Sequence, residues 1–284
     1  IQLEHAHREG FGGTIGVQAS NRDFSAVGDE AFITPTETFQ AGVFIFETWD
    51  NDVFGVEGGI RMDRVEVRNA LQGERTFEPL NASIGVHAHA SERLFIGASV
   101  SATERAPTDV ELFADGPHLA TSQFEVGDPG LDDESGVTLE ASARWTAGPL
   151  ELDASVFRYA FDDFIYLSPT GAEEDELPVF ETLQQEARFT GGELAARLDL
   201  AALAGLDGIG LRTDASIDIV RAELGDGGDV PRIPPVSASW GLEAEWSRFL
   251  TRLDVRWADE QDRVAEFERP TDGWTVVDLG VTVK

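Results

Sequence analysis

The stretch Val236–Trp257 reads VSASWGLEAEWSRFLTRLDVRW, and its pattern decides the fold. Two runs, 236–246 and 249–257, alternate residue by residue. One face of the pair would carry Val236, Ala238, Trp240, Leu242, Ala244 and Trp246, then Phe249, Thr251, Leu253, Val255 and Trp257. A two-residue period is that of a β-strand with one apolar face. Only Ser247 and Arg248 separate the runs, so the stretch predicts a hairpin with a tight turn.

The same alternation extends outward to 93–103, 211–219 and 277–283. Several runs exceed the usual strand length of about five or six residues. Long strands with one apolar and one charged face suit a wall between lipid and a polar interior, whereas a soluble sandwich has shorter ones. We therefore predict an all-β fold, an antiparallel up-and-down transmembrane β-barrel.

The alternation predicts about 13 strands, with boundaries uncertain by about two to four residues. They are 1–8, 13–20, 36–48, 53–68, 79–90, 93–105, 134–146, 149–167, 179–198, 208–223, 235–246, 249–261 and 272–284. Short connections at 9–12, 50–52, 91–92, 147–148 and 247–248 take turns with long ones at 21–35, 69–78, 106–133, 168–178, 224–234 and 262–271. Outer-membrane barrels show this asymmetry of short periplasmic turns and long external loops. The only helical expectation is one turn at 201–206.

An odd number of strands is unusual, because single-chain bacterial barrels normally have an even number. An open sheet leaves unpaired backbone amides in the hydrocarbon at both of its edges. Strand-like sequence also reaches both ends of the chain, at 1–4 and 281–284. We therefore expect an incomplete barrel that lacks strands at both ends.

Composition narrows the class of partner. The chain carries 53 acidic and 21 basic residues, for a net charge of −32. Such a surface repels nucleic acid, which is bound through Lys and Arg, and attracts cations. There is no cysteine, and hence neither a disulfide nor a thiolate metal site. No run approaches the roughly 20 apolar residues of a transmembrane helix.

One segment carries a family resemblance. Arg105-Ala-Pro107, Glu111-Leu-Phe113, Gly127-Asp-Pro-Gly-Leu131 and Glu134 follow one another in order. Together they resemble the TonB-dependent receptor family, in which a strand ending in Arg-Ala-Pro is followed by Glu-Leu-Phe and a Gly-Asn/Asp-Pro-x-Leu-x-x-Glu run. The stretches 157–166, 191–193 and 232–235 also resemble family members, so the similarity covers most of the chain.

The resemblance implies an outer-membrane barrel of about 22 strands closed by an N-terminal plug. Residues 1–284 would be a partial barrel domain, with the plug, the TonB-contacting box and the last strands outside it. It also implies a monomer in outer-membrane lipid that imports a scarce nutrient by active transport powered through the TonB system. The piece Gly116–Thr121 is most similar to the zinc-uptake branch. The resemblance implies no cofactor, and a cargo that is a metal ion or chelate, zinc or an iron–siderophore complex.

The longest connection, 106–133, holds the first candidate ligand site. His118 lies there with Asp115, Glu125 and Asp128 among other acids. Imidazole and carboxylate groups together form a zinc-compatible ligand set. We expect these residues to capture a metal or a metal complex. The alternative is that His118 is a structural loop residue packed by Pro117.

His87 and His89 form the second candidate. They alternate with Ile84, Val86 and Ala88, which places both histidines on the polar face of strand 79–90. Two histidines at positions i and i+2 of a strand share a face and can bind one metal ion. The alternative is that they are polar residues of the barrel interior that contact the plug.

Three other functions stay open at this point. A passive channel would use the same barrel without energy input, and its acidic wall would favour cations. A soluble all-β binding module would bury its apolar rows between two layers. A barrel enzyme would need a catalytic set. Because the sequence has no Gly-x-Ser-x-Gly, no His-Glu-x-x-His and no evident triad, we expect no enzyme.

Overall fold

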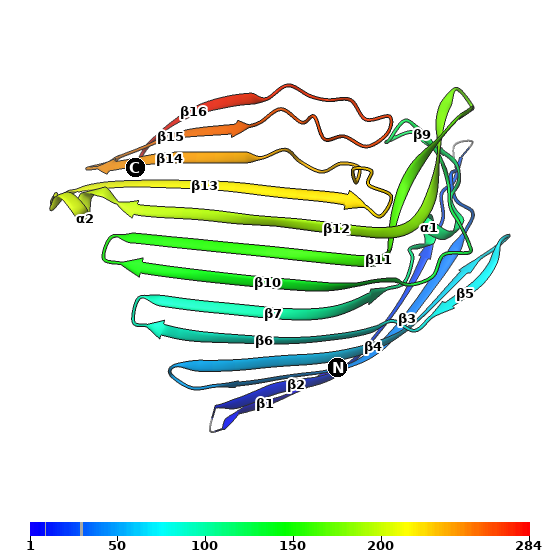
Figure 1. The fold of residues 1–284 in the computed structure, drawn as a ribbon, viewed down its shortest axis with the longest axis horizontal. Helices are drawn as coiled ribbons and strands as arrows, with labels where there is room; N and C mark the ends of the chain where they lie inside the picture. Colours follow the sequence, from blue (N-terminus) through cyan, green and yellow to red (C-terminus); the bar gives the residue numbers. More distant parts are fainter. Residues whose placement is uncertain (9, 29–30) are drawn as a thin grey trace.

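A computed structural model describes residues 1–8, 10–28 and 31–284 as one strongly curved antiparallel sheet (Figure 1). The strands are β1 (Gln2–Arg8), β2 (Phe11–Phe24), β3 (Thr36–Asp50), β4 (Phe54–Asn69), β5 (Gly73–Phe77), β6 (Leu80–Ser91), β7 (Leu94–Arg105), β8 (Asp115–His118), β9 (Gln123–Val126), β10 (Glu134–Ala147), β11 (Leu150–Glu174), β12 (Leu177–Asp199), β13 (Ile209–Leu224), β14 (Ser237–Trp246), β15 (Phe249–Ala258) and β16 (Trp274–Val283). Two short helices, α1 (Asp109–Phe113) and α2 (Leu200–Ala204), complete the described elements.

The sheet order follows the chain: β1-β2-β3-β4-β6-β7-β10-β11-β12-β13-β14-β15-β16. Each of the 13 predicted strands overlaps one strand of this path, so the up-and-down topology is confirmed. The strands β1 and β16 occupy the two ends of the order. Outside this path, β5 pairs with β4, and β8 pairs with β9, which in turn adds to β12 in parallel.

The apolar rows lie on the outer face and meet no second layer among the described residues. Ile15, Ile45 and Ile60 form one such row across β2, β3 and β4, and they are 54%, 43% and 56% exposed. Large apolar side chains exposed in contiguous rows indicate contact with another apolar phase. A one-layer wall facing lipid satisfies this pattern, and a soluble two-layer module does not.

The inner face is polar, and its charges are paired both between strands and along single strands. Arg252 of β15 donates to Asp214 of β13 at 3.0 Å and to Asp254 of its own strand at 2.9 Å. Arg61 and Asp63 form a similar pair on β4. Charged pairs that alternate with the outward apolar rows give the two-faced strands of an outer-membrane wall.

Aromatic rings mark the level of the short turns. Trp49 lies between Phe11 and Phe54, with ring centroids 6.3 and 6.0 Å apart, and Trp246 stacks on Phe249 at 5.7 Å. All five side chains lie on the outer face beside tight turns. Rings at this level are typical of the aromatic girdle at one interface of a transmembrane barrel.

The predicted long loop 168–178 is wrong. β11 and β12 continue as a paired hairpin to Glu174 and from Leu177, leaving a turn of Asp175 and Glu176. Both turn residues have positive φ, 50° and 64°, as a two-residue hairpin turn requires.

Two other predicted loops are structured in part: 69–78 contains β5, and 106–133 contains α1, β8 and β9. The expected helical turn at 201–206 is confirmed by α2, within about two residues. The predicted turn 9–12 includes Glu9, which lies outside the described residues. No helix within those residues is long and apolar enough to cross a membrane.

A new charge should destabilise the protein much more on the outer face than on the inner face. Ile84→Arg, on the outer face of β6, should destabilise the full-length protein in lipid vesicles by about 2–4 kcal/mol, because it places a guanidinium in hydrocarbon. Ser83→Arg, on the inner face, should cost much less. Denaturant titration of both variants measures the difference. Equal costs would contradict the orientation of the sheet.

Candidate functional site

The longest connection is anchored by α1, at the end of the sheet opposite the short turns (Figure 1). Thr108 caps this helix, and its hydroxyl accepts a hydrogen bond from the Glu111 amide at 3.2 Å. The Glu111 carboxylate accepts one in return from the Thr108 amide at 2.7 Å. This reciprocal capping satisfies two helix donors and fixes where the chain turns after β7. The buried Asp109 forms an ion pair with Arg22 of β2, which ties the helix to the sheet.

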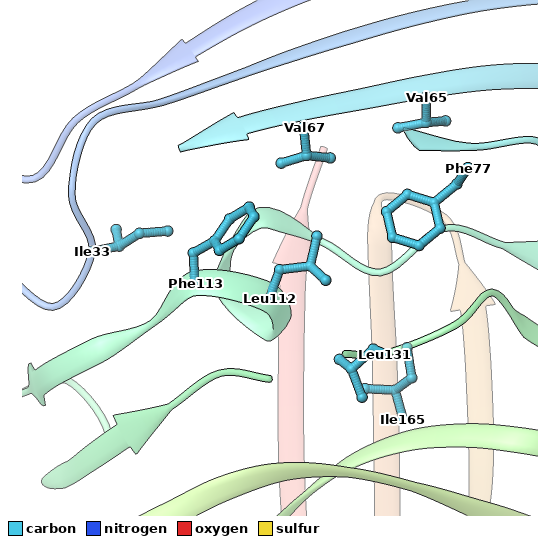
Figure 2. Packing of buried hydrophobic residues seen from close by; sticks show 8 residues of the cluster. All are labelled: Ile33, Val65, Val67, Phe77, Leu112, Phe113, Leu131 and Ile165. Carbon is cyan, nitrogen blue, oxygen red and sulfur yellow. The ribbon is translucent and has the colours of Figure 1, made fainter. Parts of the chain in front are cut away.

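A hydrophobic core lies beneath α1, beyond the apolar rows of the wall. Leu112 and Phe113 are fully buried and point toward Val67 of β4 (Figure 2). The core cluster consists of Ile33, Val65, Val67, Phe77, Leu112, Phe113, Leu131 and Ile165. Its members come from connections and strand extensions that are distant in sequence, so apolar packing fixes the position of the whole connection.

Arg105 clamps both ends of the connection. Its guanidinium donates to Glu111 at 2.8 Å and to Glu134 at 2.9 Å. The Glu134 carboxylate also accepts from the backbone amide of Ile165 at 2.9 Å. Charge-assisted bonds of this kind are about twice as strong as neutral ones. The end of β7, the helix and the start of β10 are thereby held together.

The Gly127–Leu131 run closes the connection. A Cβ at Gly127 would lie 2.7 Å from backbone atoms of Leu112 and Phe113, so only glycine permits this approach. Asp128 accepts from the Gly130 amide at 2.7 Å in an Asx turn, and Leu131 is buried in the core. The residues that carry the family resemblance are therefore the scaffold of the connection.

This scaffold presents the β8–β9 hairpin, where His118 and Glu125 meet. His118 Nδ1 lies 2.8 Å from Glu125 Oε1, and Glu125 is 4% exposed. Thr121 donates to the same carboxylate oxygen at 3.1 Å. The His118 ring stacks on Phe32 with centroids 4.6 Å apart. The imidazole is thus fixed on one edge and one face, with Nε2 on the other edge.

The structure separates the remaining predicted ligands of this connection. Asp115 is exposed and precedes His118 by an odd number of strand positions, which places the two side chains on opposite faces. Asp128 is exposed and turned to Gly130. Across residues 1–5, 10–28 and 31–284, no group of three or more His, Asp or Glu side chains could hold a metal ion.

A cavity of about 750 Å³ adjoins the hairpin at Gln123 and Glu125. Its other walls are α1, β11, β12, the end of β13 and the two connections 225–236 and 259–273. Four aromatic rings and six carboxylates contribute to the lining. They are Phe164, Tyr166, Phe180 and Phe267, with Glu111, Glu125, Asp226, Asp229, Glu266 and Glu268 against the single cation Arg232. The cavity is therefore electronegative and partly aromatic.

His87 and His89 share the inner face of β6, as the alternation predicts. Both rings contact Phe95 of β7, with centroids 5.5 and 5.3 Å away. His87 lines an inner-wall cavity of about 490 Å³ with Glu57, Glu140, Tyr159 and Glu193, whereas His89 is exposed. Tyr159 donates to Glu140 at 2.9 Å in the same cavity.

Sequence reasoning missed the residues that wall the larger cavity from 225–236 and 259–273. Arg232 of the first connection donates its backbone amide to Glu268 of the second at 2.8 Å, and its φ is 63°. The Arg232–Pro235 segment resembles family members, and this was the only signal in the sequence. The pairing of two connections on different hairpins follows from sheet order alone.

Comparisons with known proteins agree with this geometry. A family model described as TonB dependent receptor-like, beta-barrel, matches residues 3–284. The copper transporter OprC superposes with a TM-score of 0.83 at 20% identity, over 98% of this chain and 47% of that one. The FrpB iron transporter from Neisseria meningitidis gives 0.74 at 15%, over 100% and 47%. The ferric citrate transporter FecA gives 0.70 at 17%, over 99% and 45%. The chain thus spans about half the length of these structures, which share its fold.

If Arg105 holds the 106–133 connection in place, removing its charge should destabilise that connection. Arg105→Gln should leave Glu134 without its cation and cost about 1–2 kcal/mol, a value reduced because the guanidinium is partly exposed. Limited proteolysis of the full-length protein should then cut within 106–133 sooner than in the parent. Arg93→Gln, in a short turn at the opposite end, is the control. Equal protection in all three proteins would contradict the anchoring role.

The carboxyl group of Asp133 predicts that the stability of the folded protein depends on pH. Burial raises the pKa of its carboxyl above the ordinary 3.8, Glu104 and Asp132 raise it further, and Arg75 lowers it. Its buried Oδ1 has no hydrogen-bond partner among the described residues. A raised pKa means that the charged form disfavours the folded state, and that this cost disappears as the pH falls through the folded and then the ordinary pKa.

Asp133→Asn should therefore raise the thermal midpoint of the full-length protein at pH 7. The gain should shrink as the pH approaches the ordinary value of 3.8. Asp115→Asn, at an exposed site of the same connection, should change little. A gain from Asp133→Asn that is the same at both pH values would rule out the desolvated carboxylate as its source.

Proposed function

Because the chain belongs to the β-barrel family of TonB-dependent receptors, we propose that it forms part of a receptor that actively imports a metal ion or metal chelate. The family places it in the bacterial outer membrane. The observation that carries the proposal is the anchored His118–Glu125 pair beside an electronegative cavity, at the end of the wall where the long connections gather.

We propose further that residues 1–284 are a partial barrel domain of a longer receptor. In lipid, every backbone amide and carbonyl needs a partner, and the outer edges of β1 and β16 have none in the sheet order. Additional strands would supply those partners and close the barrel. A plug domain within the lumen would then couple uptake to the TonB system, and the polar inner face supports such contacts.

His118 is the proposed first ligand. In metal sites, a histidine commonly donates one ring nitrogen to a carboxylate while the other binds the metal. Glu125 holds Nδ1 at 2.8 Å, which orients Nε2 for that role. Because a single imidazole binds a bare ion weakly, the remaining ligands would come from a chelator carried with the metal. Asp115 and Asp128, which are exposed in the same connection, would attract the cation through charge alone.

The charge of the cavity limits which classes of metal complex the receptor could import. Its lining carries six carboxylates and one arginine, and acids stay in excess although Arg105 pairs with Glu111 and Arg263 with Asp229. This excess disfavours an anionic chelate and favours a metal cation or a cationic or neutral complex. We keep zinc as the first candidate, from Gly116–Thr121, and place copper beside it because imidazole suits both metals. The similar structures named as copper and iron transporters support metal uptake as the general class. His87 and His89, on the inner face, are proposed as a second contact along the path.

The first test is metal binding by the full-length receptor. His118→Ala should weaken the affinity for a neutral Zn²⁺ or Cu²⁺ chelate with an open coordination position at least tenfold, as measured by titration calorimetry. Glu125→Gln should weaken the same affinity through loss of the oriented tautomer. Arg93→Gln is the control for general damage to the barrel.

Growth of a receptor deletion under separate zinc, copper and iron limitation identifies the cargo. A defect limited to zinc or copper, restored by the parent gene and not by His118→Ala, is the expected result. Normal growth of the deletion under all three limitations would reject metal uptake.

A further inference from the structure

Three arginines gather on neighbouring strands at one point of the sheet. Arg158 of β11 and Arg221 of β13 are both paired with Thr190 of β12, one from each side. Arg188 lies two positions before Thr190 on the same strand, and therefore on the same face. With about 4.8 Å between neighbouring strands, the Cα atoms of Arg158 and Arg221 are about 10 Å apart.

The cluster faces outward. Arg158 shares its face with Val156, and Arg221 shares its face with Ile219 and Ile217, all of them exposed residues of the apolar rows. All three arginine side chains are exposed as well. The guanidinium groups therefore point away from the lumen, toward the lipid.

Their depth is that of the membrane boundary near the long connections. Strands that rise about 3.3 Å per residue and tilt by about 40° need about 10 residues to cross an apolar band about 25 Å tall. Leu150 and Leu198 are paired at the short-turn end of β11 and β12. Arg158 lies 8 positions from Leu150, and Arg188 lies 10 positions from Leu198. Arg188 thus lies at the boundary of the band. Arg158 and Arg221, both paired with Thr190, lie two positions inside it, from where their long side chains can extend to the outer-leaflet headgroups.

The cluster is also unpaired, which is unusual for this acidic chain. Most arginines of the described chain hold a carboxylate, as Arg105 and Arg252 do, whereas Arg158, Arg188 and Arg221 form no ion pair there. Glu223, the outward acid opposite Arg188, is bound to Arg263 at 2.9 Å. Three arginines without an ion pair therefore face the lipid from a protein with a net charge of −32, although the exposed Glu186 lies two positions before Arg188 on the same face.

We propose that Arg158, Arg188 and Arg221 bind the phosphate groups of a phosphorylated glycolipid of the outer leaflet, of the lipid A type. Guanidinium groups bind phosphate oxygens through paired, charge-assisted hydrogen bonds. A headgroup with two phosphates fits a cluster whose outer members are about 10 Å apart. Thr190 between them would add a hydroxyl donor. This lipid site is separate from the proposed uptake site and does not depend on the identity of the cargo.

The test uses the full-length receptor in detergent, with lipid A as the probe and native mass spectrometry or thermophoresis as the readout. The variant Arg158→Gln/Arg188→Gln/Arg221→Gln should lose at least tenfold in affinity. The control variant Arg93→Gln/Arg248→Gln, which removes two arginines at short turns, should bind like the parent. Dephosphorylated lipid A should bind the parent and the triple variant equally weakly.

Three results would overturn the assignment. The triple variant and the parent could bind lipid A with the same affinity. The control variant could lose as much affinity as the triple variant, which would indicate a general charge effect. Phosphatidylglycerol or inorganic phosphate could bind the parent as tightly as lipid A, which would show that the site does not select a glycolipid. Heat-modifiable mobility on electrophoresis verifies that each variant retains a folded barrel.

Discussion

The backbone hydrogen bond between neighbouring strands is the constraint on which this structure depends. Inside a bilayer no water is present to satisfy an amide or carbonyl, so each spanning strand must be paired on both sides. The result is a wall one sheet thick, in which the side chains of a strand face either lipid or the interior. Apolar residues such as Ile45 and Ile60 are exposed on this wall because lipid takes the place of a packed core.

A wall without a core must stabilise its external connections in another way, and here it does so with a local core. Leu112, Phe113 and Leu131 are buried only where the chain leaves the membrane and a connection can fold over the sheet. Arg105 and Glu134 close the same unit with ion pairs. The residues that identify the family are thus those that position the longest connection. His118 is positioned by this scaffold but is not part of its core, so a different residue at this position would leave the scaffold in place.

The same division explains what the sequence could predict. Strand order was predictable because lipid on one face keeps the two-residue period clean, as in β14 and β15. Beyond the membrane both faces meet water, the alternation is lost, and Pro169, Gly171 and Pro178 made the β11–β12 extension resemble a loop. His118 and Glu125 were recognised as candidates, but their contact depends on the register of a hairpin that carries no periodic signal. The cavity could not be predicted because its walls come from connections that only the folded sheet brings together.

The pairing of charged residues also depends on the face of the sheet that they occupy. On the inner face and in the connections, arginines are held by carboxylates, so the excess acid sets the field that an incoming ligand meets. On the outer face a carboxylate partner would itself have to be kept near lipid, where charge is costly and only the interfacial level is tolerant. An outward arginine at that level is therefore best compensated by an anion that the membrane provides. The unpaired state of Arg158, Arg188 and Arg221 then follows from where they lie and requires no defect in the fold: the missing partner belongs to the lipid phase.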